Sequence, residues 1–339
     1  MSKIAINGFG RIGRAFFKLA MERDELEIVA INDLGDPENL AYLLKYDSVY
    51  GPSGYDVEVK KGALVVNGKE IPLLSEKDPS KLPWKKMNVD VALESTGFFA
   101  SYEKSQMHLQ AGAKRVVISA PVKDVPPSGI TGATVLMGVN EEKLATCDIS
   151  SNASCTTNAG SPLMAILDEK IGVEKAILNT IHGYTTSQNL VDGPNKKMRR
   201  GRAAAVNIVP SSTGAALATA QAHTQLEGKF DGIAIRVPVP AGSIVDVTFI
   251  AKRDVTAEEV NDILVEAAHE DRWKDIFTVT NDPIVSTDIL GSPFASIADL
   301  DMTRVVDGNL IKVCAWYDNE VGYTNTLVQH VIKTASHAK

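Results

Sequence analysis

The chain has 339 residues, of which 44% are hydrophobic and 23% charged, and its formal net charge is −7. A length of this order is typical of two domains, and the composition is that of an ordinary globular protein. The acidic balance argues against nucleic acid as the main partner, because binding to phosphates usually needs a basic face. An anionic ligand would have to be held by a local cluster of donors.

The N-terminus and the cysteines exclude further classes of protein. The segment MSKIAINGFG has no long apolar run, so we expect no signal peptide. No stretch approaches the ~18 uninterrupted apolar residues of a membrane helix. The three cysteines, Cys147, Cys155 and Cys314, match neither a metal-ligand spacing nor a disulfide framework. We therefore expect a cytoplasmic protein with no metal site and no membrane partner.

The first half of the chain alternates apolar strands with helices. Strands are predicted, in chain order, at residues 2–8, 26–33, 89–96, 113–121 and 134–140. Helices are predicted over residues 9–25 and 104–113, and residues 55–76 are typical of an antiparallel ribbon with a turn at Lys61-Gly62 or Asn67-Gly68. Apolar strands that alternate with helices indicate a parallel sheet covered on both faces.

The pattern changes after about Asp148. A helix is predicted from Cys155 or Thr156 to Lys170, and the helix TAEEVNDILVEAAHE begins with a capping box of Thr256 and Glu259. The remaining predicted elements are strands at 174–182, 230–240, 243–253 and 309–320 and a last helix at 324–335. This half indicates a mixed or antiparallel sheet with helices on one face. We predict an α/β fold, with a Rossmann-type parallel-sheet domain followed by an α+β domain.

A glycine-rich loop connects the first predicted strand to the first predicted helix. Gly8, Gly10 and Gly13 form the pattern GxGxxG in INGFGRIG. The first glycine permits a tight turn, the second lets the backbone approach a pyrophosphate, and the third packs the helix against the strand. The N–H groups at the start of the helix then face the phosphates. This context predicts a dinucleotide site.

Asp33 supports the same prediction. It ends the second strand, twenty residues after Gly13, where an acid can bind the hydroxyls of the adenosine ribose. A carboxylate there would repel a 2′-phosphate, which favours NAD over NADP. The strand ends at 94–99 and 118–121 should line the same site. The alternative is a tight turn followed by a solvated acid.

Cys155 lies in SNASCTTN, among small polar residues that cap helices. A thiol in the first turn of a helix feels the positive end of the helix dipole, which lowers its pKa. His182 ends a predicted strand and could serve as its base. The alternatives are that Cys155 packs in the core, as unpaired cysteines usually do, and that His182 is structural.

Six motifs together carry a resemblance to a known family. INGFGRIGR, SNASCTTN, TIHGYT, SSTGAA, RVPVP and WYDNEVGYTN occur in the order and spacing seen in phosphorylating glyceraldehyde-3-phosphate dehydrogenases. The chain resembles that family over essentially its whole length. The resemblance implies a homotetramer, an NAD-binding Rossmann domain in residues 1–151 with a C-terminal helix (about 320–339) that packs back on it, and a catalytic domain in residues 152–319.

The resemblance also implies a reaction. NAD-dependent oxidation of D-glyceraldehyde 3-phosphate in the presence of inorganic phosphate would give 1,3-bisphosphoglycerate, a step of glycolysis and gluconeogenesis. Cys155 would attack the aldehyde to give a thiohemiacetal, and His182 would take the hydroxyl proton as hydride leaves. The backbone N–H of Cys155 and the His182 ring would stabilise the oxyanion. A thioester would then be cleaved by phosphate.

Two phosphate sites follow from the same resemblance. Thr185, Ser187 and Arg236 would hold the substrate phosphate. The inorganic phosphate site would consist of Ser154, Thr156, Thr213, Gly214 and one arginine of RRGR. Arg200 fits that role better than Arg199, although the loop length varies among relatives. The alternative for KKMRRGR is a solvated basic run or a nucleic-acid patch.

The resemblance implies a set of cofactor-binding residues along both halves of the chain. Asn319, through its amide, and Tyr323 should contact the nicotinamide end. The expected NAD-binding residues are Asn7, Gly8, Gly10, Arg11, Ile12, Gly13, Asp33, Lys77, Ser95, Thr96, Gly97, Ser119, Asn319 and Tyr323.

Two other functions compete with this interpretation. Erythrose-4-phosphate dehydrogenase shares the fold and nucleophile, but its relatives lack the intact STG motif and differ after the histidine, so Thr213-Gly214 and HGYTTSQ favour the three-carbon substrate. RNA binding through the nucleotide groove is a non-enzymatic alternative. The acidic charge of the chain makes RNA binding a secondary role at most, and salt-sensitive RNA binding that is competed by NAD would test this role.

Overall fold

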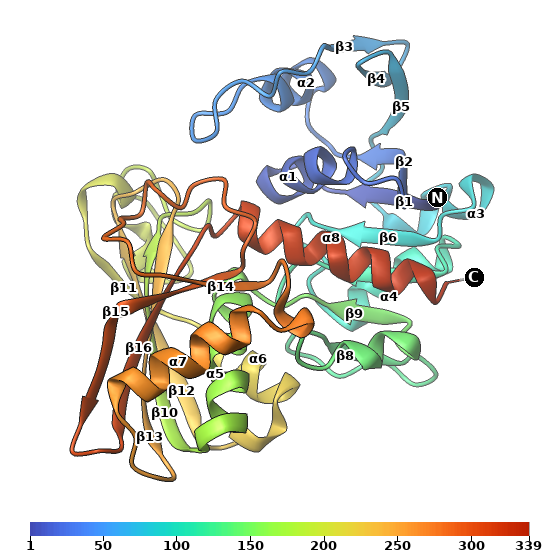
Figure 1. Cartoon of the computed structure of the whole chain (residues 1–339). Helices are drawn as coiled ribbons and strands as arrows, with labels where there is room; N and C mark the ends of the chain where they lie inside the picture. The colour runs from blue at the N-terminus through green and yellow to red at the C-terminus, as the bar shows by residue number, and fades with distance from the viewer. Residues whose placement is uncertain (339) are drawn as a thin grey trace. The chain divides into compact units, whose positions relative to one another are not determined.

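A computed structural model describes residues 1–338 as two compact units (Figure 1). The first unit contains residues 1–137 and 141–153, and the chain from Thr324 onward. The second unit contains residues 138–140 and 154–323. Each unit has its own sheet.

The sheet of the first unit has the strand order β3-β4-β5-β2-β1-β6-β7-β9-β8. The strands are β1 (Ser2–Asn7), β2 (Leu26–Asn32), β3 (Val57–Lys60), β4 (Ala63–Val66), β5 (Lys69–Leu74), β6 (Val91–Glu94), β7 (Arg115–Ile118), β8 (Gly132–Thr134) and β9 (Ile149–Ser151). β3, β4 and β5 pair antiparallel, and every other pair in the sheet is parallel. Because β1 has β2 on one side and β6 on the other, the strand order reverses there, and open α/β sheets bind ligands at such a point.

Helices and side chains of the first unit bury this sheet. Its helical segments are α1 (Arg11–Ala20), α2 (Pro37–Lys45), η1 (Pro79–Lys81), α3 (Trp84–Met87), α4 (Tyr102–Gln110), η2 (Glu141–Ala145) and most of α8 (Val321–Ser336). Ile4, Ala5 and Ile6 of β1 are fully buried, as a strand covered on both faces requires. On α8, His330 is bonded to Ser150 of β9, which ties the end of the chain to this sheet.

The sheet of the second unit has the order β11-β12-β10-β13-β16-β15-β14 and is mixed. Its strands are β10 (Val173–Gly183), β11 (Val209–Ser212), β12 (Phe230–Val237), β13 (Ser243–Ala251), β14 (Phe277–Thr280), β15 (Ser296–Val306) and β16 (Leu310–Tyr317). The helical segments are α5 (Cys155–Ile171), η3 (Met198–Gly201), η4 (Ala204–Val206), α6 (Ala215–Ala222), η5 (Thr224–Leu226), α7 (Ala257–Ala268) and η6 (Asp271–Trp273). Figure 1 shows α5, α6 and α7 on one face of the sheet. β13 alternates buried and half-buried residues, as expected for a strand that helices cover on one face.

Most predicted elements are confirmed, and the exceptions have local causes. The strand predicted at 134–140 is wrong: β8 ends at Thr134, and Gly138 has a φ of +78°, which an extended strand does not tolerate. The helix predicted over 9–25 ends at Ala20, where the apolar periodicity stops. The ribbon at 55–76 uses both predicted turns, since Lys61-Gly62 and Asn67-Gly68 each connect two strands. β9 was not predicted, because its three residues Ile-Ser-Ser show no alternation.

The described residues contain no helix with the length and apolarity that a bilayer crossing requires.

Candidate active site

The glycine loop lies at the carboxyl end of β1 and is built by close contacts. A Cβ on Gly13 would be 2.1 Å from the carbonyl oxygen of Gly8, and one on Gly8, whose φ is +98°, would be 2.6 Å from Thr96 N. A Cβ on Gly10 would meet nothing within 4 Å, so the space in front of the N-terminus of α1 is open. The loop therefore fits a pyrophosphate, which needs open space beside backbone N–H groups.

Asp33 follows β2 and faces this loop. Its carboxylate accepts hydrogen bonds from Phe9 N at 2.6 Å and from Gly35 N at 2.8 Å. These bonds fix a negative charge beside the glycine loop, where a ribose could donate to it.

The other expected residues of the first unit are distributed along the same edge. Ser95 Oγ donates to the carbonyl of Gly8 at 2.7 Å, and Asn7 ends β1 with a buried side chain. Arg11 forms a two-pronged ion pair with Asp47, so its guanidinium is already engaged. Ile12 and Ser119 are half-buried, and Lys77 and Gly97 are exposed. Among residues 1–338, neither the Lys77 side chain nor the Ser119 side chain forms a hydrogen bond to the glycine loop.

Cys155 and His182 lie together in the second unit. Ser154 caps α5, because its Oγ accepts from Thr157 N at 3.1 Å, and this places Cys155 in the first turn. His182 lies near the end of β10, which is separated from the edge strand β11 by β12. Cys155 Sγ and His182 Nε2 are 3.3 Å apart. The structure therefore brings a thiol and a base into hydrogen-bond contact.

The expected lowering of the thiol pKa is wrong in this structure. Burial raises the pKa of Cys155 above its ordinary value, and this outweighs the nearby Arg236 guanidinium and the Thr156 N–H, which lower it. Burial, followed by the charge of Arg236, lowers the pKa of His182 to about 3. Desolvation disfavours the charged form of both groups.

Arg236 is a cation in direct contact with His182 of this pair. It lies opposite His182 across β10 and β12, and its Nη1 is 2.5 Å from His182 Nδ1 and 2.9 Å from the carbonyl oxygen of Gly183. The Nε of Arg236 is buried without a hydrogen-bond partner. The guanidinium therefore has capacity for an acceptor that this chain does not supply.

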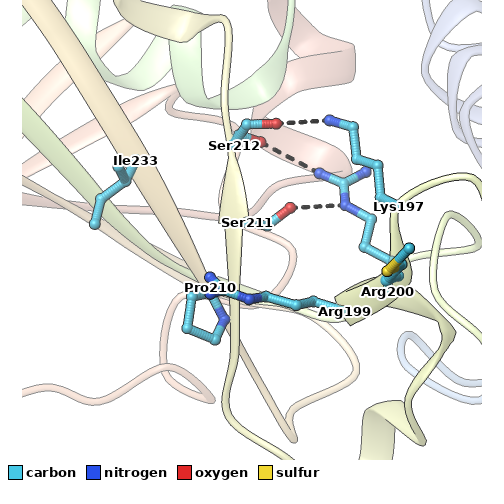
Figure 2. Close-up of a pocket in the computed structure, with 8 residues that line it drawn as sticks. Lys197, Arg199, Arg200, Pro210, Ser211, Ser212 and Ile233 are labelled. Atoms are coloured by element: carbon cyan, nitrogen blue, oxygen red, sulfur yellow. Dashed lines mark hydrogen bonds between the residues drawn. The ribbon is translucent and has the colours of Figure 1, made fainter.

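Thr185, Ser187 and Arg200 form a second group of donors. Thr185 Oγ1 and Ser187 Oγ are 2.9 Å apart, and Arg200 Nη1 donates to Ser187 Oγ at 3.1 Å. Figure 2 shows the Arg200 side chain directed at Ser211 and Ser212, in a pocket of about 460 Å³, while Arg199 extends toward Pro210. Arg200 is also close enough to His182 for its charge to lower the pKa of the imidazole.

In the described part of the chain, no hydrogen bond joins the four residues that are expected beside the arginine at the inorganic phosphate site, which are Ser154, Thr156, Thr213 and Gly214. Thr156 is buried, and its Oγ1 is 2.9 Å from the hydroxyl of Tyr317, which is 2.7 Å from Thr180 Oγ1. Its hydroxyl is therefore engaged within the unit. Ser154 Oγ caps α5, Thr213 Oγ1 accepts from Ala215 N at 3.1 Å, and Gly214 is exposed.

Asn319 and Tyr323 lie around the start of α8. Asn319 Oδ1 accepts from Gly242 N at 3.0 Å and from Ser243 Oγ at 3.2 Å. These bonds fix the amide orientation and turn its NH₂ group away from Gly242. Tyr323 is buried.

Comparisons with known proteins agree with the motifs. Residues 2–102 match the family model of the glyceraldehyde 3-phosphate dehydrogenase NAD binding domain, and residues 154–319 match that of its C-terminal domain. The chain belongs to the glyceraldehyde-3-phosphate dehydrogenase family.

Full-length relatives support the same assignment. The glyceraldehyde-3-phosphate dehydrogenase of Clostridium acetobutylicum is 49% identical over 100% of both chains. That of Streptomyces coelicolor is 46% identical, and glyceraldehyde-3-phosphate dehydrogenase 1 of Bacillus subtilis is 47% identical, each over 96% of both chains. As a member of this glycolytic family, the chain is an NAD-dependent dehydrogenase, and neither erythrose-4-phosphate dehydrogenase nor RNA binding is favoured.

The sequence analysis did not name Leu34, an exposed apolar residue after β2, whereas Phe98 lies within the range 94–99 that it expected to line the cofactor site. Leu34 follows β2 and Phe98 follows β6, and their side chains are 56% and 79% exposed. Exposed apolar side chains at the carboxyl edge offer contact area to a flat base such as adenine. The signal for Leu34 was available, because it directly follows Asp33 at the strand end that the GxGxxG context places at this edge.

Proposed function

We propose that the chain oxidises D-glyceraldehyde 3-phosphate with NAD and inorganic phosphate to 1,3-bisphosphoglycerate, through a thioester on Cys155. The observation that carries the proposal is the 3.3 Å contact between Cys155 Sγ and His182 Nε2 at the start of α5. Family membership supports the overall reaction. The assignment of individual residues is part of the proposal.

The first step uses the neutral thiol and imidazole pair. His182 Nδ1 also lies 2.7 Å from the carbonyl oxygen of Gly183, and a proton that Nδ1 donates to this oxygen leaves Nε2 as the acceptor. Nε2 takes the thiol proton as Cys155 Sγ bonds to the aldehyde carbon, and the proton then passes to the carbonyl oxygen to give a thiohemiacetal. The Cys155 backbone N–H and the His182 ring stabilise the oxyanion in between. Bound NAD supplies the acceptor for the hydride that leaves this carbon. His182 takes the hydroxyl proton at that point, and the carbon becomes the thioester carbonyl.

The second step needs a phosphate beside the thioester. A phosphate oxygen attacks the carbonyl carbon, the carbon–sulfur bond breaks, and the sulfur recovers its proton from His182. Arg236, Thr185 and Ser187 are proposed to hold the substrate phosphate. Arg200, Ser154, Thr156, Thr213 and Gly214 are proposed to hold the attacking one. Arginine forks and hydroxyls suit both tasks, and the unpartnered Nε of Arg236 supports its role.

The cofactor assignment extends to the whole set of residues predicted above. The open space at Gly10 and the carboxylate of Asp33 support pyrophosphate and ribose binding in the first unit. Asn319 would bind the carboxamide of the nicotinamide through its NH₂ group. We assign residues 1–151 and the C-terminal helix as the NAD-binding domain, and 152–319 as the catalytic domain.

Three further assignments belong to this proposal. We infer that the protein is a homotetramer, because the family resemblance implies it. We also infer a cytoplasmic enzyme, and no primary role in nucleic-acid binding. Gel filtration with light scattering tests the tetramer, and salt-dependent RNA binding competed by NAD tests the last inference.

The reaction is tested by following NAD reduction at 340 nm, a wavelength at which reduced nicotinamide absorbs, with glyceraldehyde 3-phosphate and phosphate. We expect turnover that depends on phosphate, and a Cys155→Ser variant that loses nearly all activity while it still binds NAD. Erythrose 4-phosphate serves as the comparison substrate. Rates that do not respond to phosphate, or an active Cys155→Ser variant, would contradict the proposal.

A further inference from the structure

A buried polar network lies next to the nucleotide loops of the first unit, and the mechanism above does not use it. Its centre is Glu94, the last residue of β6, which is 1% exposed. His108 on α4 and Trp84 on α3 are both 0% exposed. A buried charge is strongly destabilising unless donors surround it. The hydrogen bonds of this network therefore show which groups hold the Glu94 carboxylate.

Trp84 fixes the proton on His108. The indole Nε1 can only donate, and it lies 3.0 Å from His108 Nδ1, so Nδ1 must accept. The neutral imidazole then carries its proton on Nε2, which lies 3.1 Å from Glu94 Oε2. A second proton, on Nδ1, would place two N–H donors against each other, because the indole N–H already points at Nδ1. His108 is therefore a donor to Glu94.

Glu94 also accepts from the two loops beside it. Asn7 Nδ2 donates to Oε2 at 2.6 Å, and the backbone N–H of Thr96 donates to Oε1 at 2.8 Å. The Thr96 hydroxyl donates to Oε1 as well. Donors thus meet both carboxylate oxygens, which is the arrangement that stabilises a carboxylate as an acceptor.

The bonds to Glu94 connect both loops that are proposed to bind NAD. Asn7 directly precedes the glycine loop, and Thr96 leads into the loop after β6, where Phe98 N donates to Thr96 Oγ1 at 3.0 Å. The two loops are in tight contact, because a Cβ on Gly8 would be 2.6 Å from Thr96 N. A displacement of Thr96 is therefore transmitted to Gly8.

We propose that Glu94 is a positioning residue for NAD, which it serves through Asn7 and Thr96, and that Trp84 and His108 keep it in the accepting state. This inference rests on the proposed function, since it takes these loops to be the NAD site. Loss of the charge relaxes both loops and weakens NAD binding. Cys155 and His182 belong to the other unit, so turnover at saturating NAD is preserved.

The test is Glu94→Gln in the full-length chain. Glutamine has the same shape as glutamate, but its NH₂ group would replace one of the two carboxylate oxygens and would face the donors that bind that oxygen. We expect the NAD dissociation constant, measured by calorimetry, and KM for NAD to rise about tenfold, as for loss of a hydrogen bond to a charge. We expect kcat and KM for the aldehyde to change less than about twofold.

Asp299→Asn is the matched control. Asp299 is a buried carboxylate of the second unit that accepts from an indole, Trp316 Nε1, at 2.9 Å. Its loss should leave NAD binding unchanged. A pair of variants at His108 covers the case in which Glu94→Gln does not fold: His108→Leu removes the donor, and His108→Gln keeps an N–H group at similar reach. We expect weaker NAD binding in the first and partial recovery in the second.

Unchanged NAD affinity in Glu94→Gln or in His108→Leu overturns the inference, as does a fall in kcat with KM for NAD unchanged. No recovery in His108→Gln overturns the role of His108. If the wild-type chain binds NAD and the Glu94→Gln variant binds it with the same affinity, this inference alone is overturned. A wild-type chain that does not bind NAD overturns the proposed function as well.

Discussion

At the scale of single residues, the three cysteines differ in solvent exposure and not in the direction in which their thiol pKa is shifted. Burial raises the pKa of Cys147 and of Cys155, and that of Cys314 to about 11. Cys147 and Cys314 are 4% and 7% exposed, whereas Cys155 is half-buried and touches a base. A thiol that reacts as its proton leaves needs that base and an open path. We therefore expect the relative reactivity of the three thiols to depend on where each cysteine lies in the fold.

We expect iodoacetamide to alkylate Cys155 at least about tenfold faster than Cys147 or Cys314 in the native protein, because only Cys155 has both access and a neighbouring imidazole. Mass spectrometry of peptides from a timed reaction measures the three rates. In urea the three rates should converge, which serves as the control. Equal labelling of all three thiols in the native protein would show that His182 does not activate Cys155.

At the scale of elements, the turn from β1 to α1 has glycines with different tasks. Gly13 allows the backbone of α1 to pass close to the Gly8 carbonyl, whereas Gly10 faces open space at the N-terminus of the helix. Folding and ligand binding therefore depend on different glycines of one motif.

Alanine at each glycine separates these two tasks. Gly13→Ala should lower the free energy of unfolding by about 1–3 kcal/mol, as for an overpacked site, because its Cβ has no room. Gly10→Ala should cost about 1 kcal/mol or less and yet weaken NAD binding about tenfold, because the methyl group occupies the space in front of the N–H groups. Urea unfolding and calorimetry measure the two effects. Similar stability losses in both variants would contradict the assignment.

At the scale of the whole molecule, two buried histidines couple stability to pH. His330 bonds Ser150 Oγ at 2.7 Å and Asn152 Oδ1 at 3.1 Å in the first unit, and burial lowers its pKa to about 3. His182 in the second unit has its pKa lowered to about 3 as well. Between pH 6.5 and 3 these histidines bind protons in the unfolded chain but stay neutral in the folded chain. Lowering the pH therefore favours unfolding.

We expect the free energy of unfolding to fall as pH drops from about 6.5 toward 3, by about 1.4 kcal/mol per pH unit for each such histidine. His330→Gln keeps a polar side chain that does not titrate, so its slope should be smaller by the contribution of one histidine. Urea titrations at pH 7, 6 and 5 measure both slopes. Parallel slopes for the wild type and the variant would mean that His330 does not titrate differently on folding.

Local signals were sufficient for much of the fold. The glycine pattern predicted the β1–α1 turn, and Thr256 caps α7 by accepting from Glu259 N at 3.1 Å, as the capping box predicts. The other half of that box did not form, because the Glu259 carboxylate pairs with Arg253. β8 and β9 were misplaced or missed, since strands of three residues carry almost no periodicity.

By itself the sequence predicted the family, the alternation of strands and helices in the first half of the chain, and the candidate pair of Cys155 and His182, because motifs and periodicity are properties of neighbouring residues. It did not predict α2, α6, β11, β14 or β15. Only the tertiary structure decided the direction in which burial shifts the pKa values of that pair, and joined Trp84, His108 and Glu94 to the loops after β1 and β6. Burial and hydrogen bonding between distant segments control both features, and neither leaves a pattern along the chain.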